Sequence, residues 1–351
     1  MYLMPLWEKS TRTVWGESGL FQGEKPVRLL FPAEKILRLY NPTLSEEYKE
    51  GVHFRHTPGS DLVYPLPGSG ICALGGSGIY PDPATAKLFP VKDADAIKGG
   101  PEGKILIFDN ASFFARHQFN VDYCAVEGTV FPELPAVDEA LLPRFRKLLS
   151  EKRSVTVNLI GDSISEGFNA TEFVKAPPFA PPYLNIFAQK LKKRTSCHVT
   201  ALNSAVAGTG SRHAWEISDR WLTRPCDLLI IAFGMNELGS VPVEDYKKEL
   251  QTIMERKRAI HPDTEFILVS SMTRNPIWLG ESAAVSQRFA DALQTLAAPG
   301  CAVADLHRLW CTILEKKDFY DLTGNGVNHP NDYGHRVYCA ALESVFADIF
   351  R

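Results

Sequence analysis

Apolar and polar residues alternate in two different ways along the chain, and the change falls near residue 135. From about residue 25 to residue 130, short apolar or alternating runs are broken by Pro, Gly and Asn, without long helical periodicity. These runs predict short strands at Val27–Phe31, Ile36–Tyr40, Val52–His56, Leu62–Tyr64, Ile105–Phe108 and Phe119–Ala125. Many short strands separated by turn residues favour a small β-sandwich domain, which we place at residues 1–135.

From Ser154 onward, apolar segments alternate with amphipathic ones. The apolar segments predict buried strands at Val155–Ile160, Val199–Leu202, Leu228–Phe233, Phe266–Val269 and Ala302–Ala304. Segments with helical spacing predict helices at Tyr183–Lys193, Val243–Ile260, Ala283–Ala297 and Tyr333–Ile349. This alternation is typical of an α/β fold, a doubly wound parallel sheet with helices on both faces. We place this second domain at residues 136–351.

Composition narrows the class of protein. Of the 351 residues, 45% are hydrophobic and 23% charged, the balance of a folded globular chain. The net charge of −3 gives no basic field that would attract nucleic acid or an anionic membrane, so we expect neither as a partner. The apolar run Leu228–Phe233 is far shorter than the roughly 20 residues of a membrane helix.

The cellular location is predicted from the N-terminus and the cysteines. Pro5, Glu8 and Lys9 interrupt the first residues, which therefore do not resemble a secretory signal. Seven cysteines are scattered without a CxxC pair, as expected of free thiols in a reducing compartment. Both features favour the cytoplasm.

Four loops carry the candidate chemistry. Three follow predicted strands and one precedes the last helix; their sequences are GDSISEG (161–167), NSAVAGTG (203–210), GMNE (234–237) and NHPND (328–332). In a doubly wound sheet, sites lie beyond the carboxyl ends of the strands, so we expect the four loops to converge at one edge.

These four blocks resemble the SGNH (GDSL) hydrolase family over residues 154–351. The four residues that name the family fall on Ser163, Gly208, Asn236 and His329. The resemblance implies a flavodoxin-like, three-layer catalytic domain and a serine esterase that needs no cofactor and no metal. It also implies that Ser163 is the nucleophile and His329 its base. The oxyanion hole would consist of the backbone N–H groups of Ser163 and Gly208 and the side-chain amide of Asn236.

The chemistry of these residue types agrees with that assignment. A serine hydroxyl is a poor nucleophile unless a base within hydrogen-bond reach takes its proton, and histidine suits that task near neutral pH. Taken singly, each residue also has a structural interpretation; Ser163 and Glu166, for example, form a capping-box pattern. Four blocks in family order favour catalysis over four unrelated turns and caps.

One position departs from the family pattern. The family usually has an Asp three residues before the catalytic histidine, but here that position is Gly326, and Asn325 precedes it. A carboxylate from elsewhere could hold the imidazole, with Asp321, Asp332 and Glu166 as candidates. The alternative, which we favour, is a Ser–His dyad whose histidine Nδ1–H donates to a backbone carbonyl within residues 326–328.

The substrate is predicted from architecture. A β-sandwich before such a domain resembles bacterial carbohydrate esterases, which implies a small acylated substrate, with an acetylated sugar or oligosaccharide as the candidate. Trp278 is a candidate sugar platform, with packing as its other interpretation.

The alternatives to such an esterase are a lipase or thioesterase of the same family, a sugar-binding protein whose catalytic half has decayed, and an acyltransferase. A metal-dependent hydrolase is disfavoured because HxH, HExxH and Cys–His spacings are absent from the sequence. Oligomeric state is left open.

Overall fold

A five-stranded parallel sheet forms the centre of the C-terminal part of the chain in the computed structural model, which describes residues 2–75, 78–134, 137–279 and 283–350. The strand order is β11-β10-β12-β13-β14. The first of these strands along the chain, β10, therefore lies inside the sheet, with β11 added on one side of it and β12 to β14 on the other. The strands are β10 (Val155–Gly161), β11 (Val199–Asn203), β12 (Leu228–Ala232), β13 (Glu265–Val269) and β14 (Cys301–Ala304). The three middle strands are buried along most of their length because helices cover both faces.

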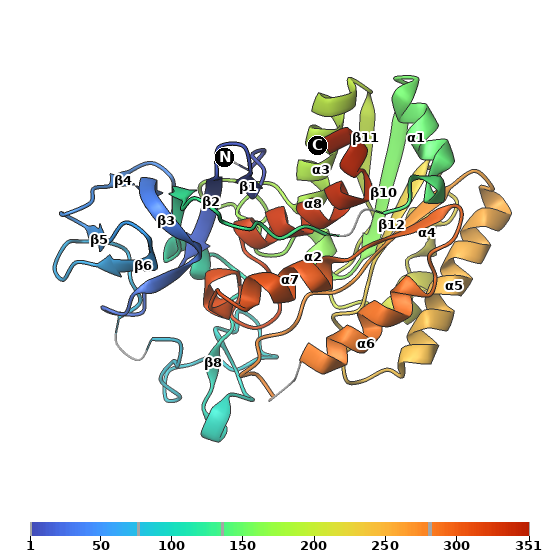
Figure 1. Cartoon of the computed structure of the whole chain (residues 1–351). Coiled ribbons are helices and arrows are strands. Elements are labelled where there is room, and N and C mark those ends of the chain that lie inside the picture. Colours follow the sequence, from blue (N-terminus) through green and yellow to red (C-terminus); the bar gives the residue numbers. More distant parts are fainter. Residues whose placement is uncertain (1, 76–77, 135–136, 280–282, 351) are drawn as a thin grey trace.

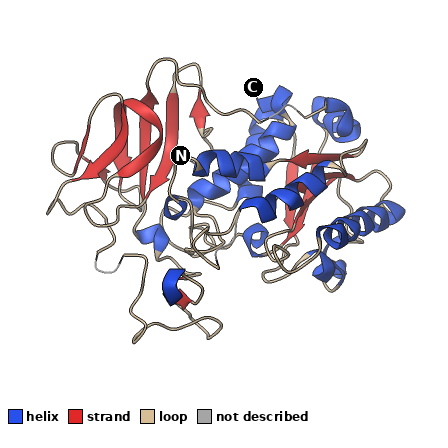
Figure 2. Ribbon diagram, turned by 60° about the horizontal axis from the view of Figure 1, so that its bottom comes forward, coloured by secondary structure: helices blue, strands red, loops and turns tan. Residues whose placement is uncertain are grey.

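Helices lie on both sides of this sheet (Figures 1 and 2). On one side α5 and α6 contact each other, and on the other α3 packs against α8. The α-helices are α1 (Pro143–Ser150), α2 (Ser163–Glu166), α3 (Tyr183–Thr195), α4 (Ser218–Trp221), α5 (Val243–Ile260), α6 (Ala283–Gln294), α7 (Leu306–Leu314), α8 (Asp332–Val345) and α9 (Ala347–Phe350). Short 3-10 turns occur at Pro101–Gly103, Phe114–Arg116, Glu139–Leu141, Ser211–Trp215 and Phe319–Asp321.

The N-terminal part is built from antiparallel strands, blue to teal in Figure 1. Its main sheet has the order β1-β2-β9-β3-β6-β5, with β4 paired to β3, and β7 forms a separate pair with β8. The strands are β1 (Trp7–Glu8), β2 (Thr13–Gly19), β3 (Val27–Tyr40), β4 (Glu47–Tyr48), β5 (Phe54–His56), β6 (Ser60–Pro65), β7 (Ala96–Ile97), β8 (Leu106–Ile107) and β9 (Phe119–Ala125). The predicted fold class is confirmed: a doubly wound parallel sheet is preceded by a smaller β-rich part, for which a β-sandwich was predicted. The predicted boundary at residues 135–136 lies outside the described residues.

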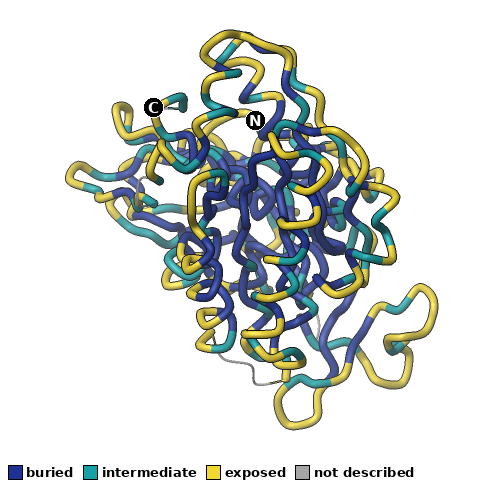
Figure 3. The backbone as a smooth tube through the Cα atoms, turned by 90° about the vertical axis from the view of Figure 1, so that its right-hand side faces the viewer, coloured by how far each residue is buried: buried dark blue, intermediate teal, exposed yellow. Residues whose placement is uncertain are grey.

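The two parts share one interior. A single cluster of buried apolar side chains runs from Leu6 and Val14 of the first part to Val345 of the second, and Figure 3 shows buried backbone continuing through the molecule. All seven cysteines are free thiols. Among the described residues, no helix is long and apolar enough to cross a membrane.

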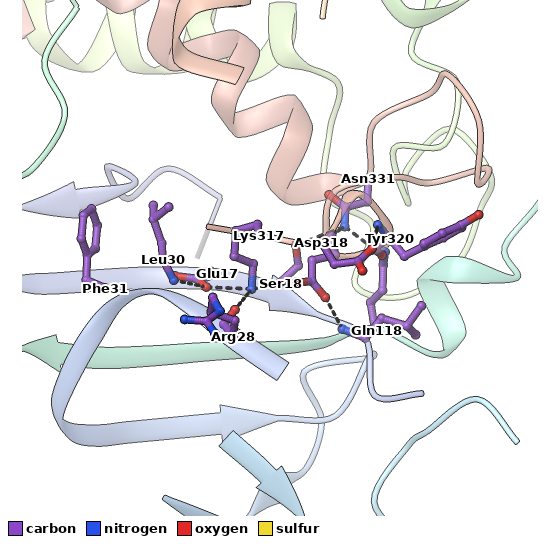
Figure 4. Close-up of polar contacts among 12 residues, drawn as sticks. Glu17, Ser18, Arg28, Leu30, Phe31, Gln118, Lys317, Asp318, Tyr320 and Asn331 are labelled. Atoms are coloured by element: carbon purple, nitrogen blue, oxygen red, sulfur yellow. Dashed lines mark hydrogen bonds and ion pairs between the residues drawn. The ribbon is translucent and has the colours of Figure 1, made fainter. Parts of the chain in front are cut away.

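Buried polar groups also join the two parts (Figure 4). The ammonium of Lys317, which has no exposed side-chain surface, lies 2.9 Å from the Glu17 carboxylate and 3.1 Å from that of Asp321, and it donates to the carbonyl of Arg28 at 2.7 Å. The Glu17 carboxylate in turn accepts the backbone N–H of Leu30 at 3.0 Å. Because a buried charge is costly unless it is paired and hydrogen-bonded, this network fixes how the first part sits on the second.

Candidate active site

Ser163 lies where β10 turns into the short helix α2. The buried strand ends at Gly161, where a Cβ would lie 2.5 Å from the carbonyl oxygen of Ala232, so only glycine fits without a shift. Asp162 caps the helix by accepting the N–H of Ile164 at 3.0 Å. Gly167, with φ 117°, ends the helix after one turn. This strand–turn–helix places Ser163 at the carboxyl edge of the sheet, as predicted.

The Ser163 hydroxyl contacts the imidazole of His329. Ser163 Oγ lies 2.9 Å from His329 Nε2, although 166 residues separate them in the sequence. The two residues are 8% and 4% exposed, and the ring of Phe168 meets the imidazole edge-on at 5.3 Å between centroids. The structure therefore brings together the two residues that the sequence analysis assigned to nucleophile and base.

A tight loop presents His329. Asn325 accepts three backbone N–H groups with its side-chain oxygen, those of Val327, Asn328 and His329, each at 3.0 Å. The carbonyl of His329 accepts from the N–H of Gly324 at 2.8 Å. Asn325 thus shapes the backbone of the loop, and its side-chain oxygen faces these N–H groups rather than the imidazole.

The imidazole Nδ1 has a partner that the sequence analysis missed. It lies 2.9 Å from the side-chain oxygen of Asn169, so the predicted backbone carbonyl within residues 326–328 is not its partner. Asn169 has a left-handed backbone with φ 62°, which asparagine tolerates better than most residues. Asn169 lies six residues after Ser163, in the long loop between α2 and α3, and no motif of the sequence marks it.

The carboxylates considered as substitutes have other partners. Asp332 accepts from the N–H and the hydroxyl of Thr171, both at 2.8 Å. Glu166 accepts from the N–H of Ala207 at 2.6 Å. Asp321 accepts from the N–H of Leu20 at 2.7 Å and pairs with Lys317.

Hydrogen bonds connect the loops that contain Gly208 and Asn236 to each other and to the end of β10, next to Ser163. The N–H of Val206 donates to the carbonyl of Gly161 at 3.1 Å, and the Asn236 amide donates to the carbonyl of Thr209 at 2.7 Å. Gly208 is exposed, has φ 75° and has open space where a Cβ would lie, so its backbone conformation rather than crowding favours glycine. All four predicted blocks therefore meet at the carboxyl edge of the sheet.

Buried carboxylates lie under this edge. Glu237, next to Asn236, accepts the N–H groups of Gly234 and Ser211 and so ties the Asn236 turn to the Gly208 loop. Burial, reinforced by the nearby carboxylate of Glu237, raises the pKa of Asp162 to about 7. Asp162 therefore carries less than a full negative charge at neutral pH, directly beside the candidate nucleophile.

Burial controls the protonation of His329. It lowers the pKa of His329 to about 3, with a further contribution from His335. The imidazole is therefore neutral at pH 7 and can accept a proton at Nε2. In the described part of the chain, no group of three or more His, Cys, Asp or Glu side chains is arranged to hold a metal ion.

Trp278 packs between the two parts of the molecule. Its indole N–H donates to the carbonyl of Lys98 at 3.0 Å, and the guanidinium of Arg274 lies over its ring at 5.6 Å. The ring joins a small apolar cluster that includes Val327 of the His329 loop. The substrate contact expected of Trp278 stays a prediction.

Comparison with known proteins agrees with this arrangement. The model of the GDSL-like lipase/acylhydrolase family matches residues 159–337, half of the chain, and that span contains Ser163, Gly208, Asn236 and His329. The chain belongs to this family. This GDSL hydrolase is thus a carboxylic ester hydrolase. A search of curated proteins finds no match to the chain.

Several solved structures are similar in fold to the GDSL hydrolase. An α/β hydrolase from the metagenome of Lake Arreo, Spain, is 20% identical, with 56% of this chain and 96% of that chain covered and a TM-score of 0.46. A two-domain esterase active on acetylated mannans is 14% identical, with 61% and 55% covered and a TM-score of 0.46. The acetylxylan esterase Axe2 of Geobacillus stearothermophilus is 17% identical, with 54% and 94% covered and a TM-score of 0.43. At these identities the likeness extends to the fold alone.

Proposed function

We propose that this GDSL hydrolase cleaves short-chain acyl esters by nucleophilic catalysis, with Ser163 as nucleophile and His329 as general base. The observation that carries the proposal is the 2.9 Å contact between Ser163 Oγ and His329 Nε2 in a site where burial keeps the imidazole neutral. Such a base takes the serine proton as Oγ attacks the ester carbonyl and returns it to the leaving alcohol. Water then releases the acyl group by the same route.

The oxyanion formed in this attack needs donors on one side of the ester carbonyl. We assign that role to the N–H groups of Ser163 and Gly208 and to the amide of Asn236. An amide nitrogen carries two hydrogens, so the bond from Asn236 to Thr209 uses one and leaves the other for the substrate. Loss of one such donor typically lowers kcat by roughly 10² to 10³.

For the substrate we propose a small acyl group, acetyl first, on a carbohydrate alcohol. The sequence has no extended apolar lid of the kind that long acyl chains need. A polar loop of the first part, Asp109 to Ala111, borders the site, and the exposed Asn110 in it accepts from Asn325 at 3.2 Å. Such a rim suits a hydroxyl-bearing alcohol better than a lipid. Trp278, in this proposal, lines the sugar side.

The test is hydrolysis of p-nitrophenyl acetate, butyrate and octanoate. We expect the rate to fall with chain length, and Ser163→Ala to lose at least about 10³-fold in kcat/KM, since the nucleophile is gone. Ser165→Ala is the matched control. Ser165 lies in the same short helix as Ser163, but its hydroxyl is hydrogen-bonded to Tyr183 and does not contact His329.

The possible results separate the alternatives. Turnover that survives Ser163→Ala would rule out the serine mechanism. Faster turnover of octanoate than of acetate would point to a lipase or thioesterase. If the protein cleaves none of these esters and a fluorophosphonate probe does not label Ser163, the pair is not catalytic and a binding role gains support.

A further inference from the structure

The side-chain amide of Asn169 contacts four groups at once. Its oxygen lies 2.9 Å from Nδ1 of His329. Its nitrogen lies within hydrogen-bond distance of three carbonyl oxygens, those of Asp109 (3.1 Å), Ala111 (3.2 Å) and Gly324 (2.9 Å). Asn169 is 3% exposed, so its amide is bonded to protein groups rather than to solvent.

These partners determine which way the amide points. A carbonyl oxygen only accepts hydrogen bonds, so three carbonyls around one end of the amide require the NH₂ group there. The amide oxygen must then face the imidazole and needs a donor. Nδ1 of His329 must therefore carry the ring proton, which leaves Nε2 with a lone pair for the hydroxyl of Ser163.

The same surroundings explain why a carboxylate is absent. An aspartate at position 169 would place a second oxygen against three carbonyl oxygens with no donor between them. A buried polar group without a partner costs free energy, and a buried charge costs more. An amide satisfies both sides, because it accepts from the imidazole and donates to the carbonyls.

Both parts of the molecule hold this amide. The carbonyls of Asp109 and Ala111 come from the first part, and that of Gly324 from the His329 loop. The preceding residue, Phe168, is fixed through its carbonyl, which lies 3.2 Å from Nε2 of the buried His335. The position of Asn169 thus depends on the β-rich part as well as on the catalytic sheet.

We infer that Asn169 is the positioning residue of a Ser–His–Asn triad, in which carbonyls from both parts of the molecule orient its amide and thereby set the tautomer of His329. This inference rests on the proposed function of Ser163 and His329. It gives the asparagine the task that the family usually gives to an aspartate. It also gives the first part of the chain a role in building the active site.

The kinetic test compares Asn169→Ala and Asn169→Asp with the wild type. We expect Asn169→Ala to lower kcat on the order of 10- to 100-fold while KM changes by less than about 3-fold, because the ring loses orientation rather than substrate contact. In Asn169→Asp, a negative charge beside the imidazole favours its charged form, so the acid limb of kcat/KM should move to higher pH. His335 is the other titratable side chain that acts on His329, and both variants retain it.

Asn185→Ala is the matched control. It deletes the exposed amide of an asparagine in α3 that takes part in none of the contacts described for the site. We expect its kcat to stay within about 2-fold of wild type. Equal kcat values and equal acid limbs in the wild type, Asn169→Ala and Asn169→Asp would overturn the inference.

A spectroscopic measurement on the wild type tests the tautomer without any activity. In protein labelled with ¹⁵N-histidine, the resonances of His329, assigned through His329→Gln, should show a protonated Nδ1 and a bare Nε2 at pH 7. A proton on Nε2 instead would overturn the inference even in an active enzyme. If the wild type cleaves no ester, the proposed function fails, whereas the tautomer still decides the role of Asn169.

Discussion

At the scale of single residues, the proposed mechanism depends on a histidine, His329, that stays neutral over an unusually wide range of pH. Burial, with His335 nearby, holds the pKa of His329 at about 3, well below its ordinary value of 6.5. Asn169 adds no charge that would raise it. A histidine with a lowered pKa stops acting as a base only when the pH falls through that low value.

This sets the expected pH dependence of hydrolysis. We expect kcat/KM for p-nitrophenyl acetate to stay level from pH 7 down to about pH 5, where a histidine with an ordinary pKa would already have lost most of its free base. The measurement is a pH–rate profile with circular dichroism at each pH, so that unfolding is not read as protonation. A fall centred near pH 6.5 that persists in folded Asp162→Asn, which lacks the carboxyl with a pKa of about 7, would contradict the neutral, buried base.

The candidate residues that the sequence analysis named differ from the one it missed in whether a local sequence motif marks them. Ser163 and His329 each stand in a short block that can be read locally. Asn169 stands in no such block, because its role comes from a left-handed backbone and from carbonyls 58 to 155 residues away. No local pattern encodes a contact of that kind.

At the scale of elements, the parallel strands were predicted to within a residue or two. Apart from the partly exposed edge strand β11, they are buried on both faces and mostly apolar. The antiparallel part was harder. Two strands were expected at residues 27–31 and 36–40, but the structure has one strand, β3, with irregular register around Ala33. Pro32 suggested a break, yet a bulge accommodates it.

The loop from Thr323 to Asn331 is the element on which the site depends most, and at Gly324 it packs tightly against Asn169. A Cβ there would lie 2.3 Å from the Cβ of Asn169 and 2.8 Å from the carbonyl oxygen of Pro330. We expect Gly324→Ala to displace both Asn169 and His329. It should lower kcat by at least about 10-fold and destabilise the fold by about 1–3 kcal/mol.

The measurements are ester hydrolysis and urea unfolding. Gly75→Ala is the control, since a Cβ at Gly75 has open space around it and its backbone is not left-handed. If both alanine variants behave like the wild type, the loop can accommodate a Cβ at position 324, and Gly324 does not constrain the positions of Asn169 and His329.

At the scale of the whole molecule, the β-rich part is built into the catalytic half. Asn331, two residues after His329, donates through its side chain to Ser18 at 3.1 Å and to Gln118 at 2.9 Å, both in the first part. The buried Lys317 lies in the same interface (Figure 4). Its partner Glu17 is 300 residues away in the sequence, so the pairing could not be predicted from local pattern.

Lys317 provides the last prediction. Burial alone would lower the pKa of Lys317, but the carboxylates of Asp321 and Glu17 outweigh it and the pKa is raised. The ammonium therefore stays charged at every pH below its usual 10.5, and its contribution to stability is lost only in more alkaline solution. Lys317→Met would leave two carboxylates buried without their cation, which we expect to cost about 3–5 kcal/mol in urea unfolding at pH 7.

Lys316→Met is the matched control, because Lys316 is exposed beside it and should change stability by less than about 0.5 kcal/mol. Lys317 and Asp321 join the first part to the segment that leads into the His329 loop. Lys317→Met should therefore lose activity at urea concentrations below those that unfold it globally. Equal urea midpoints for the two methionine variants would mean that apolar packing and the uncharged hydrogen bonds join the two parts, and that the buried charges add nothing to stability. The first part would then hold Asn169 without help from the buried charges.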